Sequence, residues 1–129
     1  MKGYVTNIEK ASLDNTTFRT VLYTTKRTQL VVMSIPVGED IGMEVHGDHD
    51  QFIRVERGTG KAVLDSVEYP LEDGSAVVIP AGTQHNIVNT GKDDMRLYTI
   101  YSPPEHRDGT VHPLKADAKE EHFDGKTTE

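Results

Sequence analysis

Two stretches of the sequence decide its fold: GEDIGMEVHGDHDQFIRVERG at residues 38–58 and GSAVVIPAGTQHNIVN at residues 74–89. Both contain short runs rich in valine and isoleucine, and glycine, proline or aspartate interrupts these runs. Such runs predict β-strands separated by turns. Side chains able to bind a metal stand at the ends of the runs, and they are Glu44, His46, Gln51 and His85. The two stretches therefore predict both β-structure and a candidate site.

The same pattern extends over most of the chain. We expect strands at residues 18–23, 30–35, 43–46, 52–56, 61–64, 68–71, 76–79, 85–89 and 96–101. Regular short strands with Gly/Pro turns indicate an all-β sandwich or closed barrel rather than an α/β fold. We expect residues 1–113 to form one barrel domain. Residues 114–129 read as a polar tail that is partly disordered, with a short helix within residues 115–121.

Composition excludes several functions. The chain has 129 residues, a formal net charge of −7 and no cysteine. The negative charge argues against binding to nucleic acid and to anionic membrane surfaces. The lack of cysteine excludes disulfides, thiolate nucleophiles and zinc–cysteine sites. The first residues lack the apolar core of a signal peptide, and no apolar run is long enough to span a bilayer, so we expect a cytoplasmic protein.

Strand geometry predicts that the candidate ligands converge. Side chains two apart on a strand point to the same face, so Glu44 and His46 face the same way. A turn at residues 47–50 returns Gln51 on the neighbouring strand, and His85 begins another strand. If these faces form the barrel interior, two imidazoles, one carboxylate and one amide meet there. Such a set suits one divalent ion, which is zinc, manganese, iron or nickel. The ion would polarise a substrate oxygen or lower the pKa of a bound water.

The lining of the expected pocket follows from the same alternation. Ile53 shares a face with Gln51, and Ile87 and Asn89 share a face with His85. Together with Tyr101 from the last strand, these residues are expected to line the pocket.

Both motifs resemble those of the cupin superfamily, whose pattern is Gly-x5-His-x-His-x(3,4)-Glu-x6-Gly followed by Gly-x5-Pro-x-Gly-x2-His-x3-Asn. The second motif matches at every fixed position, namely Gly74, Pro80, Gly82, His85 and Asn89. The first matches in spacing, but Glu44 stands where the first histidine is expected and Gln51 where the glutamate is expected. Glu44 restores the single carboxylate at a new position. The resemblance covers residues 34–101 and implies a small single-domain cupin with a jelly-roll barrel, also called a double-stranded β-helix.

The resemblance also implies classes of function. The first is a metal-dependent enzyme, of the isomerase or epimerase, dioxygenase or lyase class, that acts on a small oxygen-rich metabolite. The alternative is a non-catalytic cupin that binds or senses a small ligand. A homodimer is implied too, and the edge of the segment 18–23 would pair across its interface. The residues leave one further alternative open, a metal-free cupin in which the polar groups form an internal hydrogen-bond network.

The remaining histidines have two interpretations each. His49 lies in the turn after His46 and is expected to be exposed. His106 and His112 belong to a turn-rich strap that lies either on the outside of the barrel or as a lid over its mouth, where a histidine would carry protons. His122 reads as part of the tail.

Overall fold

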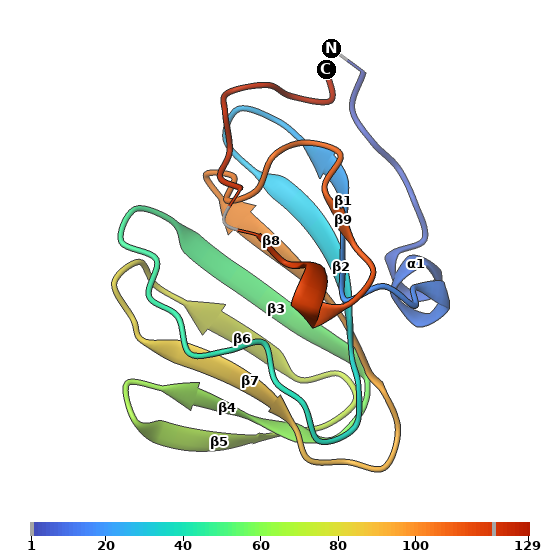
Figure 1. The fold of residues 1–129 in the computed structure, drawn as a ribbon, viewed down its shortest axis with the longest axis vertical. Coiled ribbons are helices and arrows are strands. Elements are labelled where there is room, and N and C mark those ends of the chain that lie inside the picture. Colours follow the sequence, from blue (N-terminus) through green and yellow to red (C-terminus); the bar gives the residue numbers. More distant parts are fainter. Residues whose placement is uncertain (1, 120) are drawn as a thin grey trace.

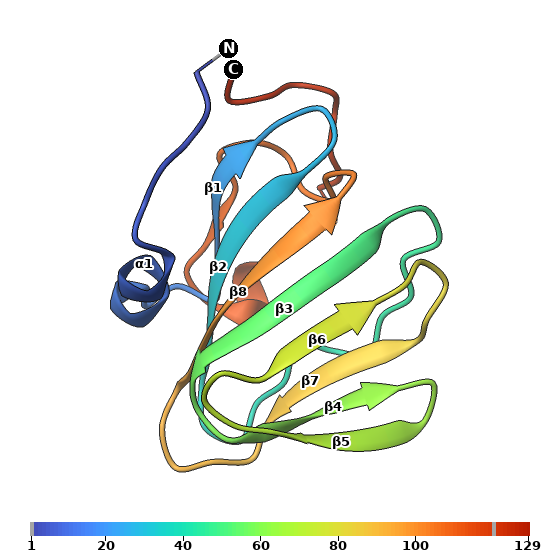
Figure 2. The same cartoon turned by 180° about the vertical axis from the view of Figure 1, so that it is seen from behind.

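Two antiparallel sheets surround one hydrophobic core in the computed structural model, which describes residues 2–119 and 121–129 (Figures 1 and 2). The larger sheet has the strand order β6 (Ala76–Ile79), β3 (Asp50–Arg57), β8 (Met95–Ser102), β2 (Gln29–Ile35), β1 (Arg19–Thr24) and β9 (Val111–His112). The smaller sheet has the order β5 (Val67–Leu71), β4 (Gly60–Leu64) and β7 (His85–Asn89). The predicted all-β jelly-roll class is confirmed.

The core lies between the sheets because the strands alternate as predicted. In β3, for example, Ile53 and Val55 are fully buried whereas Arg54 and Glu56 are only partly buried. The apolar side chains of β2, β3 and β8 meet those of the smaller sheet, such as Ala62 and Ile87. Burial of apolar surface of this kind is the main favourable term in folding.

One predicted strand is wrong. Residues 43–46 form no strand, and the segment between β2 and β3 follows β7 with only two isolated bridges, Asp40 to Val88 and Glu44 to His85. The predicted alternation of exposed and less exposed side chains is present, since Met43 and Val45 are exposed and Glu44 and His46 are partly buried. However, Gly42 and Gly47 flank the segment, and a short run between glycines does not sustain a regular ladder.

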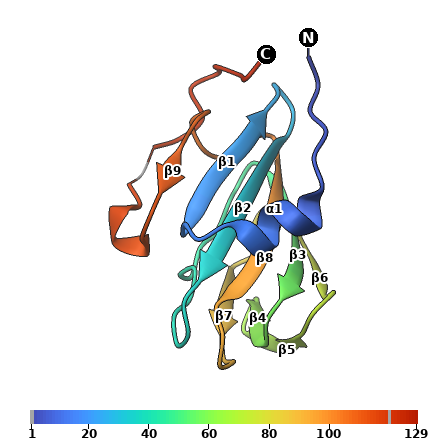
Figure 3. The same cartoon turned by 90° about the vertical axis from the view of Figure 1, so that its right-hand side faces the viewer.

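A short helix, α1 (Ile8–Asp14), was not predicted from the sequence. The side chain of Asn7 accepts a hydrogen bond from the N–H of Lys10 and so caps the first turn. At the other end, Arg96 of β8 donates hydrogen bonds to the carbonyl groups of Leu13 and Asn15. The helix packs on the outer face of the larger sheet, on the side away from β9 (Figure 3).

The C-terminal part of the chain folds back over the barrel. A 3-10 helix at Lys115–Asp117 lies within the predicted helical region. The N–H of Thr128 donates to the carbonyl of Thr24, and Tyr23 donates to the carboxylate of Glu129. The N–H of Gly3 also donates to this carboxylate, and the two termini lie side by side (Figure 1). The division at residue 113 into a domain and a tail remains a prediction.

Strand β1 is not the edge that the sequence suggested for a dimer interface. It lies between β2 and β9, which pairs with it through His112 and Val111. This part of the prediction is therefore wrong, and the homodimer itself remains a prediction. Within residues 2–119 and 121–129, no helix has the length and apolar character needed to cross a bilayer.

Candidate metal centre

Glu44 and His85 are held opposite each other by a pair of backbone hydrogen bonds. The N–H of Glu44 donates to the carbonyl of His85 over 2.9 Å, and the N–H of His85 donates to the carbonyl of Glu44 over 2.8 Å. The carbonyl of His46 accepts from the N–H of Gly82 over 2.7 Å, which ties the same segment to the turn before β7. The spacing of both motifs therefore places three candidate ligands on one wall.

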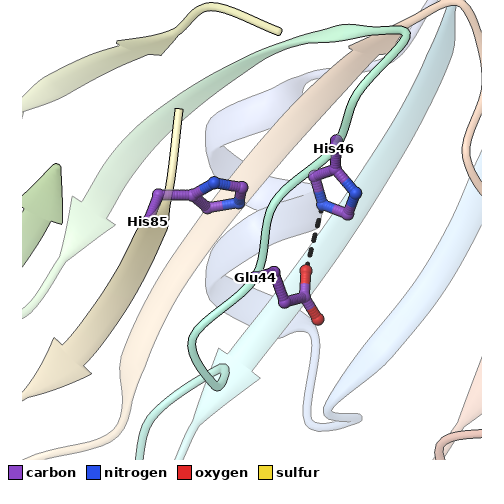
Figure 4. A group of neighbouring side chains, drawn as sticks. All are labelled: Glu44, His46 and His85. Atoms are coloured by element: carbon purple, nitrogen blue, oxygen red, sulfur yellow. Dashed lines mark ion pairs between the residues drawn. The ribbon is translucent and has the colours of Figure 1, made fainter. Parts of the chain in front are cut away.

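The side chains of Glu44, His46 and His85 converge (Figure 4). Their ligand atoms all lie within 4.8 Å of one another. Oε2 of Glu44 is 3.0 Å from Nε2 of His46, and the two imidazole rings have centroids 5.1 Å apart. Two imidazoles and a carboxylate at such distances form a ligand set that divalent transition metals accept.

The orientation of His85 leaves one ring nitrogen available. Nδ1 of His85 lies 2.9 Å from the carbonyl oxygen of Thr83. A carbonyl only accepts hydrogen bonds, so Nδ1 carries the proton and Nε2 keeps its lone pair. A backbone carbonyl that fixes the tautomer in this way is a common partner of metal-binding histidines.

His46 and Glu44 form a close pair in the site. Nε2 of His46 is buried, and Oε2 of Glu44 lies 3.0 Å from it. The imidazole nitrogen and the carboxylate oxygen are close enough together that one metal ion could be held by both residues.

Glu44 and His46 each stabilise the charged form of the other. Burial acts to raise the pKa of Glu44, but His46, Arg19 and His85 outweigh it, and the pKa lies below its ordinary value. Burial acts to lower the pKa of His46, but the carboxylates of Glu44 and Glu105 outweigh it, and this pKa lies above its ordinary value. Glu44 is therefore an anionic ligand near neutral pH, and a metal ion would compete with a proton for His46.

Gln51 occupies the interior face of β3 but is engaged elsewhere through its nitrogen. Its Cα lies opposite those of Tyr101 in β8 and Ile79 in β6. Nε2 of Gln51 donates to Oγ1 of Thr99 over 3.0 Å, which fixes the amide, and Oε1 is buried without a hydrogen-bond partner in the described residues. The free oxygen suits a fourth ligand, a role that remains a prediction.

His49 is buried, so the expectation of an exposed turn residue is wrong. Only 3% of its side chain is exposed, and its ring packs against His46 at 4.4 Å and edge-on against Tyr101 at 5.6 Å. Nε2 of His49 lies 3.1 Å from Oε2 of Glu105. His46, His49 and Glu105 thus form a second group whose ligand atoms lie within 4.8 Å.

The strap that follows β8 carries Glu105 and closes the barrel end. Gln29 of β2 holds it, because its amide accepts from the N–H of His106 over 3.0 Å and donates to the carbonyl of His106 over 2.8 Å. His106 and His112 are 9% and 6% exposed. His106 lines a cavity beside Glu44 and His46, as the interpretation of a lid expects, whereas His112 lies in β9 at the edge of the larger sheet. His122 reaches the strap as well, with Nδ1 3.1 Å from Oε1 of Glu105.

The buried His106 predicts how stability depends on pH. Burial, and then the positive charge of Arg19, lower the pKa of His106 from 6.5 to about 2. The unfolded chain binds this proton below about pH 6.5 whereas the folded protein does not, so the free energy of unfolding falls as the pH falls. His106→Gln is expected to remove a slope of up to about 1.4 kcal/mol per pH unit between pH 6.5 and 5.

Urea unfolding of the metal-free protein at several pH values measures this slope. His122→Gln is the matched control, because 70% of the His122 side chain is exposed. Equal slopes in the wild type and in His106→Gln would show that the ring takes up its proton in the folded state.

A cavity of about 440 Å³ lies beside the three-residue group. Its lining comes from β1, the segment before β3, the strap and the tail, and includes Arg19, Glu44, His46, Glu105, His106 and Lys119. Small-molecule sites in proteins commonly have volumes of this order.

Of the four residues predicted to line the pocket, Ile53, Ile87 and Asn89 lie away from the cavity, whereas Tyr101 packs against the candidate ligand His46. Ile53 and Ile87 are fully buried in the hydrophobic core. The side-chain amide of Asn89 forms hydrogen bonds with the backbone. It donates to the carbonyl groups of Ile35 and Asp93 and accepts from the N–H of Gly91. Tyr101 lies edge-on to the imidazole rings of His46 and His49. Asn89 is thus a clamp for the turn before β8.

Sequence reasoning missed Arg19, the first residue of β1. It is 5% exposed and lines the cavity. The signal was its position in the strand, because Arg19 shares a face with Val21, two residues along, which is buried. A charged residue on an apolar face is rare enough to mark a candidate site.

The fold and the site define a small β-barrel protein with a histidine–carboxylate group at one end of the barrel. The chain belongs to the cupin family, because residues 31–101 match the family described as "Cupin domain". It is 48% identical over 123 residues to uncharacterized protein YrkC of Bacillus subtilis. The aligned residues make up 91% of this chain and 66% of YrkC. Protein L612 of Acanthamoeba polyphaga mimivirus is 43% identical over 112 residues, which cover 84% of this chain and 70% of L612. The chain thus spans about two thirds of the length of these relatives.

Among solved structures, BH2720 from Bacillus halodurans is similar with a TM-score of 0.89 and 44% sequence identity. The similarity covers 90% of this chain and 92% of BH2720. This coverage is larger than the 71 residues, 31–101, that the family match covers.

Proposed function

We propose that this cupin holds one divalent metal ion through Glu44, His46 and His85, with the amide oxygen of Gln51 as a fourth ligand. The observation that carries the proposal is the convergence of three ligand atoms within 4.8 Å beside a cavity. A metal-free hydrogen-bond network would give a partner to Oε1 of Gln51. This atom is buried without one in the described residues, which is unfavourable unless a ligand is present.

The bound ion would supply Lewis acidity toward an oxygen of the ligand. The chain's own residues set the conditions for that chemistry. The carbonyl of Thr83 fixes the ring of His85, and Glu44 contributes the one negative charge of the group. A divalent ion in this set keeps a net positive charge, which favours binding of an oxygen-rich ligand.

Glu105 is placed to accept or return a proton. Its carboxylate is only 14% exposed, faces the cavity, and is not required as a ligand by the group at Glu44. Nδ1 of His122 lies 3.1 Å from Oε1 and Nε2 of His49 lies 3.1 Å from Oε2, so the carboxylate is held in position. A positioned carboxylate beside a metal-bound ligand is a candidate general base.

We therefore propose a metal-dependent cupin that acts on, or binds, a small oxygen-rich metabolite. The experiment that separates these two roles is a screen of protein loaded with zinc, manganese, iron or nickel. It records oxygen uptake, isomerisation of small sugars and acids, and shifts of the melting temperature. Turnover that disappears in Glu105→Gln while the metal is retained supports the enzyme. A higher melting temperature when a small metabolite is added to the metal-loaded protein, without turnover, supports the ligand-binding alternative. The absence of both turnover and such a shift contradicts the proposal.

A further inference from the structure

Arg19 is a buried cation in the wall of the cavity. It opens β1, pairs in register with Met33 of β2 and His112 of β9, and is 5% exposed. Its guanidinium lies 5.1 Å from the centroid of the Phe18 ring. Phe18 and Arg19 line the cavity together with Glu44, His46 and His106.

The guanidinium is only partly satisfied by the protein. Nη1 lies 3.2 Å from Nδ1 of His112, and because arginine has no acceptor, that nitrogen of His112 accepts. Nε of Arg19 is buried without a hydrogen-bond partner, and no carboxylate of the described residues forms an ion pair with this side chain. A buried charge without a paired anion is unfavourable, so this geometry favours an anionic ligand.

We propose that Arg19 is the anion-recognition residue of the cavity, and that the ligand is a small oxygenated acid whose carboxylate binds the guanidinium. The planar fork of arginine matches the two oxygens of a carboxylate. The inference deepens the proposed function and rests on the same cavity, but the contact with Arg19 does not require the metal ion.

The surroundings favour a carboxylate over a phosphate. Glu44, Glu105 and Glu121 also line the cavity and would repel a dianion. Lys115 is paired with Asp40. The cavity volume of about 440 Å³ is that of a small-molecule site.

The surroundings also keep the positive charge on the guanidinium rather than on its neighbours. Burial and the charge of Arg19 lower the pKa values of both His106 and His112, so these two rings are neutral near pH 7. When a metal ion takes up the charge of Glu44, Arg19 faces an even more positive site. A carboxylate that bridges Arg19 and the metal side of the cavity would complement this field.

The test is a comparison of acids with their neutral counterparts, by calorimetry and melting temperature, on metal-free and metal-loaded full-length protein. The probes are glycolate against glycolamide, lactate against lactamide, and gluconate against sorbitol, with glucose 6-phosphate as the phosphate arm. We expect at least one acid to bind at least tenfold more tightly than its neutral counterpart in the metal-free protein. The preference should be lost in Arg19→Met and weakened in Arg19→Lys.

The outcomes separate this inference from the metal proposal. An acid preference that depends on Arg19 in metal-free protein supports the inference even if no metal binds. No acid preference, a preference that survives in Arg19→Met, or tighter binding of the phosphate ester would overturn it.

The melting temperature of the ligand-free protein tests whether Arg19 has a purely structural role. Removal of a buried cation that lacks an anion should leave the ligand-free melting temperature of Arg19→Met unchanged or higher. A lower melting temperature with an unchanged ligand preference would assign Arg19 to the structure alone and overturn the inference.

Discussion

His85→Ala is expected to lower the affinity of the protein for nickel or zinc by at least about 100-fold. Loss of an outer-sphere partner of a metal ligand lowers affinity by about 10- to 100-fold, and this change removes a ligand atom itself. His85 is also the residue whose tautomer is set for ligation by the carbonyl of Thr83. Titration of metal into chelator-treated protein measures the effect.

A matched histidine variant controls for non-specific metal binding. His122→Ala removes an imidazole whose side chain is 70% exposed and which lies outside the group at Glu44, so its affinity should stay close to that of the wild type. Both variants should show wild-type circular dichroism. If His85→Ala binds metal as tightly as His122→Ala, the site lies elsewhere.

Gly60→Ala is expected to destabilise the barrel by roughly 3 kcal/mol or more, at the upper end of the range for overpacked cores. Gly60 begins β4 at a point where β7 and β8 approach closely. A Cβ there would overlap the carbonyl oxygen of Val88 and Cε of Met95. The methionine side chain can move, but the backbone oxygen belongs to the β7 ladder next to Asn89.

The control for this variant is Gly47→Ala, because a Cβ at Gly47 meets nothing within 4 Å. Gly47 is exposed in the turn before β3, so the substitution should change the free energy of unfolding by less than about 0.5 kcal/mol. Urea unfolding measures both. Equal stabilities for the two variants would mean that β4 and β7 are farther apart than described.

Much of the fold followed from the sequence because the information was local. Alternating valine and isoleucine between glycines predicts strands with defined inner faces, and eight of the expected strand segments overlap β1–β8. The motif spacings likewise predicted that Glu44, His46 and His85 would meet. Backbone hydrogen bonds between the two motifs fix these residues, since they join Glu44 to His85 and His46 to Gly82, and the motif spacings therefore carried the information.

The rest of the candidate site depended on contacts between distant parts of the chain. His49 turns inward because Glu105 and Tyr101, more than fifty residues away, provide its surroundings. The strap is held by Gln29, a strand residue with no unusual pattern around it. Helix α1 is also short, with Asn7 as its cap and Arg96 as its C-terminal partner, so its intrinsic signal is weak.

The most direct test of the central claim is the metal content of the wild-type protein. The protein is produced in medium supplemented with zinc, manganese, iron and nickel, purified without chelators or affinity metals, and measured by elemental analysis. The convergence of Glu44, His46 and His85 predicts close to one equivalent of a single transition metal per chain, reduced to background in His46→Ala/His85→Ala. Less than a tenth of an equivalent in the wild type, or equal content in the double variant, would contradict the claim.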